Sequence, residues 1–316
     1  MKPLTLAAFA CLVACGGQLT SDPEIGDAPP AAATTLTETH GTVAALAVDA
    51  TDVYWIAIPT GGTQGTLFKA PKTGGTATLV ASRLTQDSVY GLELGNELAY
   101  TNSSSGLKKV TKSGNASPIV VALDSINNIA VSSESLYWAT ADGVIHSTPA
   151  QSGTPSTLLT EAKSIVLLAV DRSHIYWVRR DRATRNPSTL MYADLNGTNA
   201  VAIDSLGNET GHPFLALDAD TLYWGTERTI RKVIKSTHTA TPVLAVDFSA
   251  GPRVRSDGRH LYAIDRGIRR ISVSGGNATT VVTNTRITTF ALDDGFVYWA
   301  EDTSLDRPAT IRRVAK

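Results

Sequence analysis

One short unit recurs along this chain of 316 residues, and it constrains the fold more than any other feature. The unit is an apolar strand that often ends in Asp, a short turn, and a second strand that contains Tyr-Trp. All five tryptophans of the protein occupy the same place in it, which random placement would hardly produce. Seven copies occur, at residues 45–55, 92–100, 129–138, 168–177, 215–224, 254–263 and 291–299. The chain is therefore expected to be a tandem array of one structural unit.

The spacing of the copies predicts the size of that unit. From Tyr54 to Tyr298 the period is about 41 residues, which is the length of a four-stranded blade of a β-propeller. The rest of each unit supplies two more strands, such as residues 106–110 and 267–271, with glycine-containing turns such as residues 73–76. No segment combines a helical period with capping residues. We predict an all-β fold, a seven-bladed β-propeller of four-stranded antiparallel blades, with six blades as the alternative if one repeat is degenerate.

The two ends of the chain predict how the ring closes. The seventh unit stops after its third strand, at residues 310–316, and an unmatched outer strand lies near the other terminus, at residues 34–38. An open ring would leave strand edges unpaired and the first and last blades able to separate. We therefore expect the N-terminal strand to complete the last blade.

The first residues have the pattern of a secretion signal. Lys2 precedes an apolar run, residues 4–14, that is too short to span a bilayer. The run ends in Leu-Val-Ala-Cys-Gly, which resembles the lipobox of bacterial lipoproteins. The resemblance implies cleavage before Cys15 and attachment of a lipid to its thiol; an ordinary signal peptide with a chance cysteine is the alternative.

This pattern divides the chain into three parts. We expect a signal peptide at residues 1–14, a flexible tether rich in Gly, Pro and Ala at residues 15–32, and the propeller at residues 33–316. The protein would cross the inner membrane and be held by its lipid. Gly16, after the cysteine, favours the outer membrane if the host sorts lipoproteins as enterobacteria do.

The repeat itself resembles the YWTD propellers of low-density-lipoprotein receptors and their bacterial relatives. The similarity covers residues 34–316 and rests on the order of apolar strand, Asp, turn, Leu-Tyr-Trp, a Gly-x-Ile-x-Arg strand and a glycine turn. Two features differ: that family has six blades, and residues such as Ile56 and Ala57 stand where it has Thr-Asp. The resemblance implies a binding or structural module without catalytic residues.

Composition narrows the range of partners. The formal net charge is -1 and charged residues make up 18% of the chain, so there is no basic surplus for nucleic acid or an anionic membrane surface. The six histidines show no metal-binding spacing, and the mature chain would have no thiol nucleophile. We expect a monomer without metal or cofactor that touches the membrane through its lipid anchor alone.

Two repeated features each have a structural and a functional interpretation. The Asp residues before the first turn could hold calcium, or could accept hydrogen bonds from the turn backbone. The Tyr-Trp pairs could stack on a ligand, or could fill the space between neighbouring sheets. We expect the structural role in both cases. The Asp residues are Asp49, Asp171, Asp218, Asp257 and Asp293.

Irregular loops are the better candidates for function, because repeats preserve packing whereas insertions differ from blade to blade. The long connections are expected on one face, and one of them carries the only dense basic cluster of the sequence. Arginine is enriched at interfaces, so this face is a candidate for contact with an envelope or extracellular protein, against the alternative of a solvated loop. The candidate binding residues are Arg179, Arg180, Arg182, Arg185, His212 and Asp302.

A second class of function is a propeller lactonase or lyase, with a metal or histidine at the mouth of the channel. The residues available for it are His40, Asn127, Asn128 and His212, which form no recognisable catalytic set. We therefore expect a binding or scaffolding module rather than an enzyme.

Overall fold

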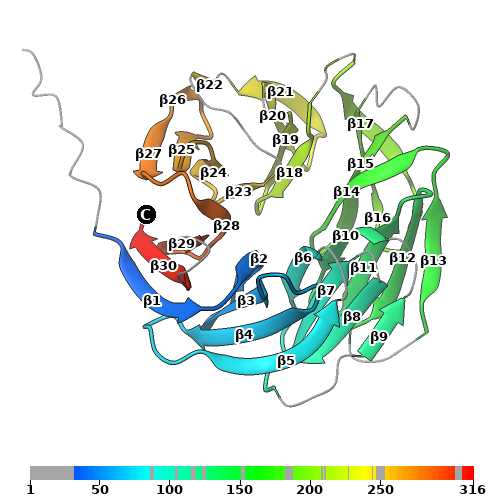
Figure 1. Ribbon diagram of the computed structural model, residues 1–316. Helices are drawn as coiled ribbons and strands as arrows, with labels where there is room; N and C mark the ends of the chain where they lie inside the picture. Colours follow the sequence, from blue (N-terminus) through cyan, green and yellow to red (C-terminus); the bar gives the residue numbers. More distant parts are fainter. Residues whose placement is uncertain are drawn as a thin grey trace, which may run out of the picture. The chain divides into compact units, whose positions relative to one another are not determined.

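The computed structural model describes residues 32–85, 89–103, 106–114, 119–122, 126–150, 154–181, 188–207, 209, 211–226, 228–243, 245–246, 253–302 and 308–316. Every helix or strand within these ranges is a β-strand. The strands form seven four-stranded antiparallel sheets, arranged as the blades of a β-propeller (Figure 1). The predicted fold class and blade number are thereby confirmed.

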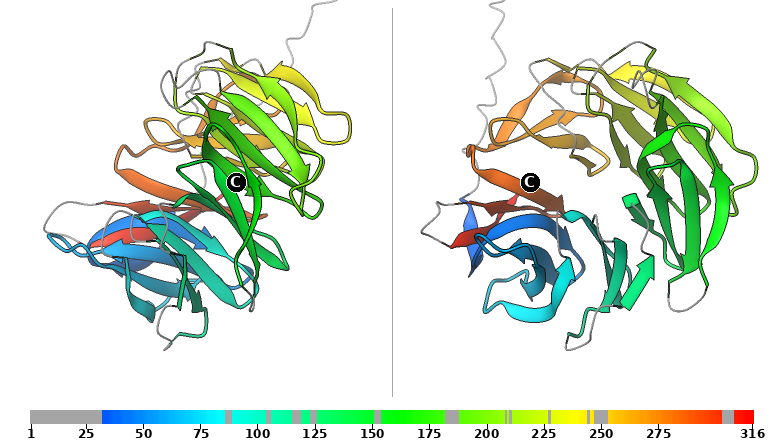
Figure 2. Two further views of the ribbon diagram at one scale, coloured as in Figure 1. Left: turned by 90° about the vertical axis from the view of Figure 1, so that its right-hand side faces the viewer. Right: turned by 45° about the vertical axis from the view of Figure 1, so that its right-hand side comes forward.

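The blades follow one another around the ring in sequence order (Figure 2), and the first strand of each blade lies innermost (Figure 1). Blade 1 comprises β2 (Thr42–Val48), β3 (Asp52–Ile58), β4 (Gly65–Pro71) and β5 (Thr78–Thr85). Blade 2 comprises β6 (Val89–Leu94), β7 (Leu98–Ser103), β8 (Gly106–Thr111) and β9 (Ile119–Ala122). Blade 3 comprises β10 (Ile126–Val131), β11 (Ser135–Thr140), β12 (Val144–Pro149) and β13 (Ser156–Thr160). Blade 4 comprises β14 (Ser164–Val170), β15 (His174–Arg180), β16 (Thr189–Asp194) and β17 (Val201–Ser205). Blade 5 comprises β18 (Phe214–Leu217), β19 (Thr221–Gly225), β20 (Ile230–Ile234) and β21 (Thr239–Val243). Blade 6 comprises β23 (Val254–Ser256), β24 (His260–Ile264), β25 (Ile268–Ser272) and β27 (Thr279–Val282), and blade 7 comprises β28 (Ile287–Leu292), β29 (Phe296–Glu301), β30 (Ala309–Ala315) and β1 (Thr34–Thr39).

The ring closes as predicted, because the N-terminal strand completes the last blade. Strand β1 pairs antiparallel with β30, with Thr34 opposite Arg313 and Thr39 opposite Ala309. Leu36 of β1 is buried in the apolar cluster that joins blade 7 to blade 1. A short parallel pair, β22 (Ala245–Val246) with β26 (Gly276–Asn277), adds a link between blades 5 and 6.

The hydrophobic core is divided into seven clusters, one at each interface between neighbouring blades. Successive side chains of a strand point to opposite faces of the sheet, so the Tyr and the Trp of one repeat face different neighbours. Tyr176 packs between blades 4 and 5, in the cluster of Trp224, whereas Trp177 packs between blades 3 and 4, in the cluster of Tyr137. All five tryptophans are at most 1% exposed. The core role predicted for the Tyr-Trp pairs is confirmed.

The repeated Asp residues also have the predicted structural role. In blade 1, Asp49 Oδ1 accepts hydrogen bonds from the backbone N–H groups of Thr51 and Asp52, at 3.0 and 2.9 Å. Its Oδ2 accepts a bond of 2.8 Å from the ammonium group of Lys112 in blade 2. Burial on its own raises the pKa of Asp49, but these hydrogen bonds lower it to about 2 overall. The same lysine-to-aspartate clasp joins Lys235 to Asp171, Lys316 to Asp257 and Lys72 to Asp293.

The Asp positions of blades 2, 3 and 5 make no such clasp among the described residues, and Ser132 stands at this position in blade 3. Gly95 of blade 2 stands at the Asp position, and the facing position in blade 3 is Ala150, whose carbonyl accepts a hydrogen bond of 3.1 Å from Tyr100 Oη. Blade 5 keeps Asp218, and Ser256 of blade 6 donates a hydrogen bond of 3.0 Å to its carboxylate. On the side of the ring where the first two strands of each blade are joined, polar side chains thus bond neighbouring blades to one another.

Candidate functional site

The two faces of the propeller differ in how their connections are built. On one face, the first two strands of every blade are joined by three residues, as at 49–51 and 95–97; we call this the turn face. The opposite loop face carries the connections between the second and third strands and those between blades. They lie together there: Leu206 N–H donates to the Ser188 carbonyl at 3.0 Å. The loop-face connections range from two residues (104–105) to ten (244–253, which include β22). On the turn face, the connections between the third and fourth strands vary less, from four residues (235–238) to seven (112–118).

Two arginines of the predicted basic cluster make specific contacts between elements. Arg179 forms an ion pair of 2.7 Å with Glu161, which follows the outer strand of blade 3. Arg180 donates a hydrogen bond of 2.9 Å to the carbonyl of Gly211, in the connection from blade 4 to blade 5. The end of β15 is thereby tied to both neighbouring blades.

The other predicted binding residues are dispersed. His212 lies beside Gly211 in the connection that Arg180 holds, whereas Asp302 follows β29 in blade 7, where its N–H donates to the Arg286 carbonyl at 3.0 Å. Burial raises the pKa of Asp302. Three of the predicted site residues, Cys15, Arg182 and Arg185, lie outside the described residues.

The residues considered for a lactonase or lyase do not form one site. His40 lies between blades 7 and 1, and His212 lies between blades 4 and 5. In β10, the Asn127 amide donates to the Ile165 carbonyl at 3.0 Å, and Asn128 Oδ1 accepts from the Leu168 N–H at 3.2 Å. Both asparagines therefore link blade 3 to blade 4. Of the four, Asn128 lines the central channel.

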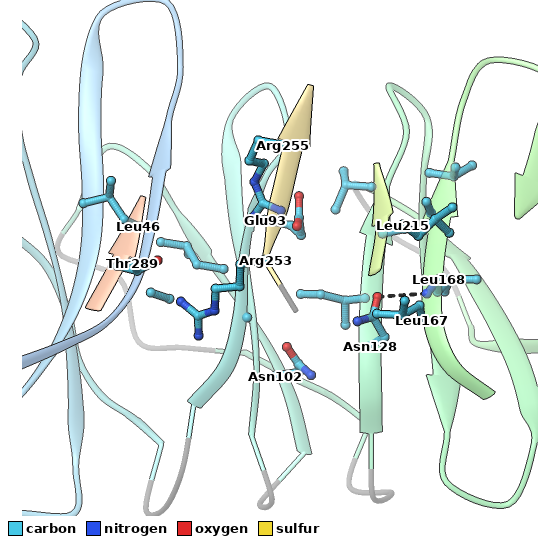
Figure 3. Close-up of a pocket in the computed structure, with 18 residues that line it drawn as sticks. Leu46, Glu93, Asn102, Asn128, Leu167, Leu168, Leu215, Arg253, Arg255 and Thr289 are labelled. Carbon is cyan, nitrogen blue, oxygen red and sulfur yellow. Dashed lines mark hydrogen bonds between the residues drawn. The ribbon is translucent and has the colours of Figure 1, made fainter. Parts of the chain in front are cut away.

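The central channel is the cavity that the ring creates at its centre (Figure 3). It has a volume of about 400 Å³ and is bounded by the inner strands of all seven blades. Much of its wall is apolar, for example Leu92, Ile129 and Leu168. Three charged side chains, from blades 2 and 6, project into it: Glu93, Arg253 and Arg255.

Glu93 and Arg255 interact electrostatically across the channel. Glu93 lies on the inner strand of blade 2 and Arg255 on that of blade 6, and both side chains project into the channel (Figure 3). Burial raises the pKa of Glu93, and the positive charge of Arg255 partly offsets that rise. The positive charge of Arg255 therefore favours the ionised form of Glu93, against the effect of burial.

Arg253 has no such counter-charge among the described residues that line the channel. Its guanidinium reaches from blade 6 to blade 1, where it donates hydrogen bonds of 3.5 and 3.4 Å to the Ala44 carbonyl. Burial lowers the pKa of Arg253, and the nearby positive charge of Arg255 lowers it further. Because the chain enters the inner strand of blade 6 from the loop face, Arg253 lies nearer to that face than Arg255 does.

Asn102 adds a buried polar group to the same cavity. It is 1% exposed, and its Nδ2 donates a long hydrogen bond of 3.4 Å to the Ile126 carbonyl. Its Oδ1 has no hydrogen-bond donor within the described part of the chain. Gly91 lies opposite it in the sheet, and a Cβ atom there would come within 2.9 Å of that oxygen. The glycine thus leaves room for the amide.

Sequence reasoning missed the charged groups of the channel, although the repeats contain a signal for two of them. When the repeats are aligned on the Asp position, Glu93 and Arg255 stand where the other five copies have alanine. Two opposite charges at an otherwise alanine position indicate a shared environment. That signal is visible only when the seven units are compared position by position.

Comparison with known proteins supports the fold alone. No family model and no curated protein matches the chain. Among solved structures, a chain of the mitotic checkpoint complex is similar with a TM-score of 0.67 at 13% identity, over 95% of this chain and 98% of that one. The computationally designed Ika8 protein is similar with a TM-score of 0.61 at 15% identity, over 84% and 83% of the two chains. Identities this low show a shared propeller architecture.

Neither a metal cluster nor a membrane-spanning helix occurs in the described residues. They contain no group of three or more His, Cys, Asp or Glu side chains placed to hold a metal ion. They also contain no helix that is long and apolar enough to cross a membrane. The site that the structure does bring together is the channel cluster of Glu93, Asn102, Arg253 and Arg255.

Proposed function

We propose that this protein is a lipid-anchored binding module of the bacterial cell envelope, attached through Cys15 and engaging an envelope or extracellular protein with its loop face. The lipobox-like sequence at residues 12–16 supports the anchor, and the repeat that resembles YWTD propellers supports a binding role. The channel would lie behind the same face.

The observation that carries this proposal is the difference between the two faces. On the turn face, the connection between the first two strands is three residues long in all seven blades, and four Asp–Lys clasps join neighbouring blades there. Changing a residue there would disturb the ring. The loop face carries connections of different lengths, and such irregular loops on a rigid scaffold commonly carry binding function.

The anchor is tested by lipid labelling. Three acyl chains on the N-terminal cysteine would bury enough methylene groups, at roughly 0.8 kcal/mol each, for stable residence in the membrane. The wild-type protein should incorporate labelled palmitate and sediment with membranes, and Cys15→Ser should do neither. A wild-type protein that takes up no palmitate and fractionates as soluble would disprove the anchor.

The contact face is tested by crosslinking in the cell envelope. Because Arg179 is paired with Glu161, its loss would disturb blade packing, so the informative variant is the double substitution Arg182→Ser, Arg185→Ser. It should weaken capture of a partner without changing the melting temperature. Wild-type capture should also fall with added salt, which screens exposed charges.

The matched control is Arg172→Ser, an exposed arginine in a connection of the turn face. It should retain wild-type crosslinks. If the double variant also retains every crosslink, the arginines of this loop are not the contact site.

A further inference from the structure

The channel holds an excess of positive charge. Two arginines, Arg253 and Arg255, face a single acidic residue, Glu93, among the described residues that line the channel. Withdrawing an ion from water is costly unless an opposite charge compensates it. The channel is therefore suited to one negative charge, placed beside Arg253.

Arg253 also has hydrogen-bonding capacity to spare. A guanidinium has five N–H donors. Within the described chain, the guanidinium of Arg253 donates only the two long hydrogen bonds to the Ala44 carbonyl. Planar anions such as carboxylates fit a guanidinium through two parallel hydrogen bonds. A carboxylate would use the donors that the protein leaves open.

Asn102 indicates, independently of Arg253, that the ligand carries a hydrogen-bond donor. Its Oδ1 is a buried acceptor with no donor, which is costly to leave unmatched. A ligand that carried a hydroxyl or an ammonium group next to its carboxylate could donate to this oxygen. The two groups line one cavity, with Arg253 between the levels of Glu93 and Asn102 (Figure 3).

The size and charge of the cavity narrow the ligand class further. A volume of about 400 Å³ lies at the small end of ligand pockets. A phosphate monoester carries a charge of about −1.5 to −2 at neutral pH, which exceeds the formal charge of +1 that Arg253, Arg255 and Glu93 give the channel. A monocarboxylate matches the surplus.

We propose that the channel is a binding site for a small hydroxy- or amino-monocarboxylate, whose carboxylate pairs with Arg253 and whose donor group reaches Asn102. This site goes beyond the proposed function, because it lies inside the ring and needs neither the lipid anchor nor a protein partner.

The test is calorimetric titration of the full-length protein, purified in detergent, with lactate, acetate and inorganic phosphate as probes. Lactate should bind saturably and more tightly than acetate, and phosphate should bind weakest. Arg253→Gln should lower the affinity for lactate by at least about tenfold, because a charge-assisted bidentate contact is lost. Arg253→Lys, which keeps the charge without the planar fork, should recover part of that loss.

Two further variants keep the result decisive. Asn102→Ala should reduce the affinity for lactate to that for acetate and leave the affinity for acetate unchanged. A general loss of structure would weaken the binding of both. Arg172→Gln, the same change at an exposed turn-face arginine, should bind as the wild type does. Absence of saturable carboxylate binding, equal binding by Arg253→Gln, or preference for phosphate would each overturn the proposal. None of these results depends on crosslinking by the loop face, so failure of the channel proposal can be distinguished from failure of the proposed binding role of the loop face.

Discussion

The ammonium group of Lys112, in blade 2, donates a hydrogen bond of 2.8 Å to the carboxylate of Asp49, in blade 1. The two side chains are 13% and 21% exposed, so the pair is partly withdrawn from water. Such a pair is screened less by solvent than one on the open surface. Because Asp49 also closes its own turn, this contact couples the local structure of one blade to the position of the next.

We expect Lys112→Met to lower the free energy of unfolding by about 2 kcal/mol, because Asp49 would lose its charged partner while it stays partly buried. A double-mutant cycle with Asp49→Asn, followed by urea denaturation, should give a coupling energy of about 1–2 kcal/mol. Lys69→Met is the control, since Lys69 pairs with Asp52 of its own blade at 3.8 Å. Equal losses for the two lysines would show that the clasp between blades has no special role.

The clasps predict that stability falls in acid. Hydrogen bonds lower the pKa of Asp49, Asp171 and Asp257 from 3.8 to about 2 in the folded protein, despite the opposing effect of burial. The unfolded chain then binds more protons at low pH, so the stabilisation is complete above about pH 5 and is lost as the pH falls towards 2. Each carboxylate should contribute on the order of 1–2 kcal/mol.

Denaturation at stepped pH measures this effect. Asp171→Asn should flatten the acid limb of the stability profile. Asp220→Asn, at an exposed position in a turn-face connection, should leave that limb as it is. A wild-type stability that does not change between these pH limits would contradict the assigned role of the clasps.

Trp224 tests the packing between blades. Its side chain is 0% exposed, and its indole N–H donates a hydrogen bond of 3.0 Å to Asp204 of blade 4. Trp224→Ala should cost about 3–5 kcal/mol, as large-to-small core substitutions do. Leu79→Ala removes an apolar side chain that is 50% exposed and should cost under about 0.5 kcal/mol. An unchanged melting temperature for the tryptophan variant would argue against its core role.

Ring closure by β1 is tested with two truncations. Deleting residues up to Glu38 removes most of the strand that pairs with β30, together with the buried Leu36. Each lost backbone hydrogen bond contributes about 1 kcal/mol and the apolar face adds more, so the melting temperature should fall markedly. Deleting residues 16–31 leaves β1 intact and should have little effect. Identical melting temperatures would contradict closure by this strand.

The sequence alone determined the architecture. Strand alternation, the Asp turns and the recurrent Tyr-Trp pair are local patterns, and seven repetitions of them define seven blades. The unmatched strand at residues 34–38 even predicted the pairing of β1 with β30, because a missing strand at one end had a counterpart at the other. The Asp and Trp roles followed from the same local rules.

The tertiary structure decided the contacts that join distant units. Lys112 and Asp49 are 63 positions apart in the sequence, and Arg253 reaches the Ala44 carbonyl from 209 positions away. Arg179 appeared as part of a basic cluster, yet it pairs with Glu161 of the neighbouring blade. The sequence specifies each blade through neighbours along the chain. The pairs Lys112–Asp49 and Arg179–Glu161 meet because consecutive blades pack side by side, and Arg253 meets the Ala44 carbonyl because the ring closes.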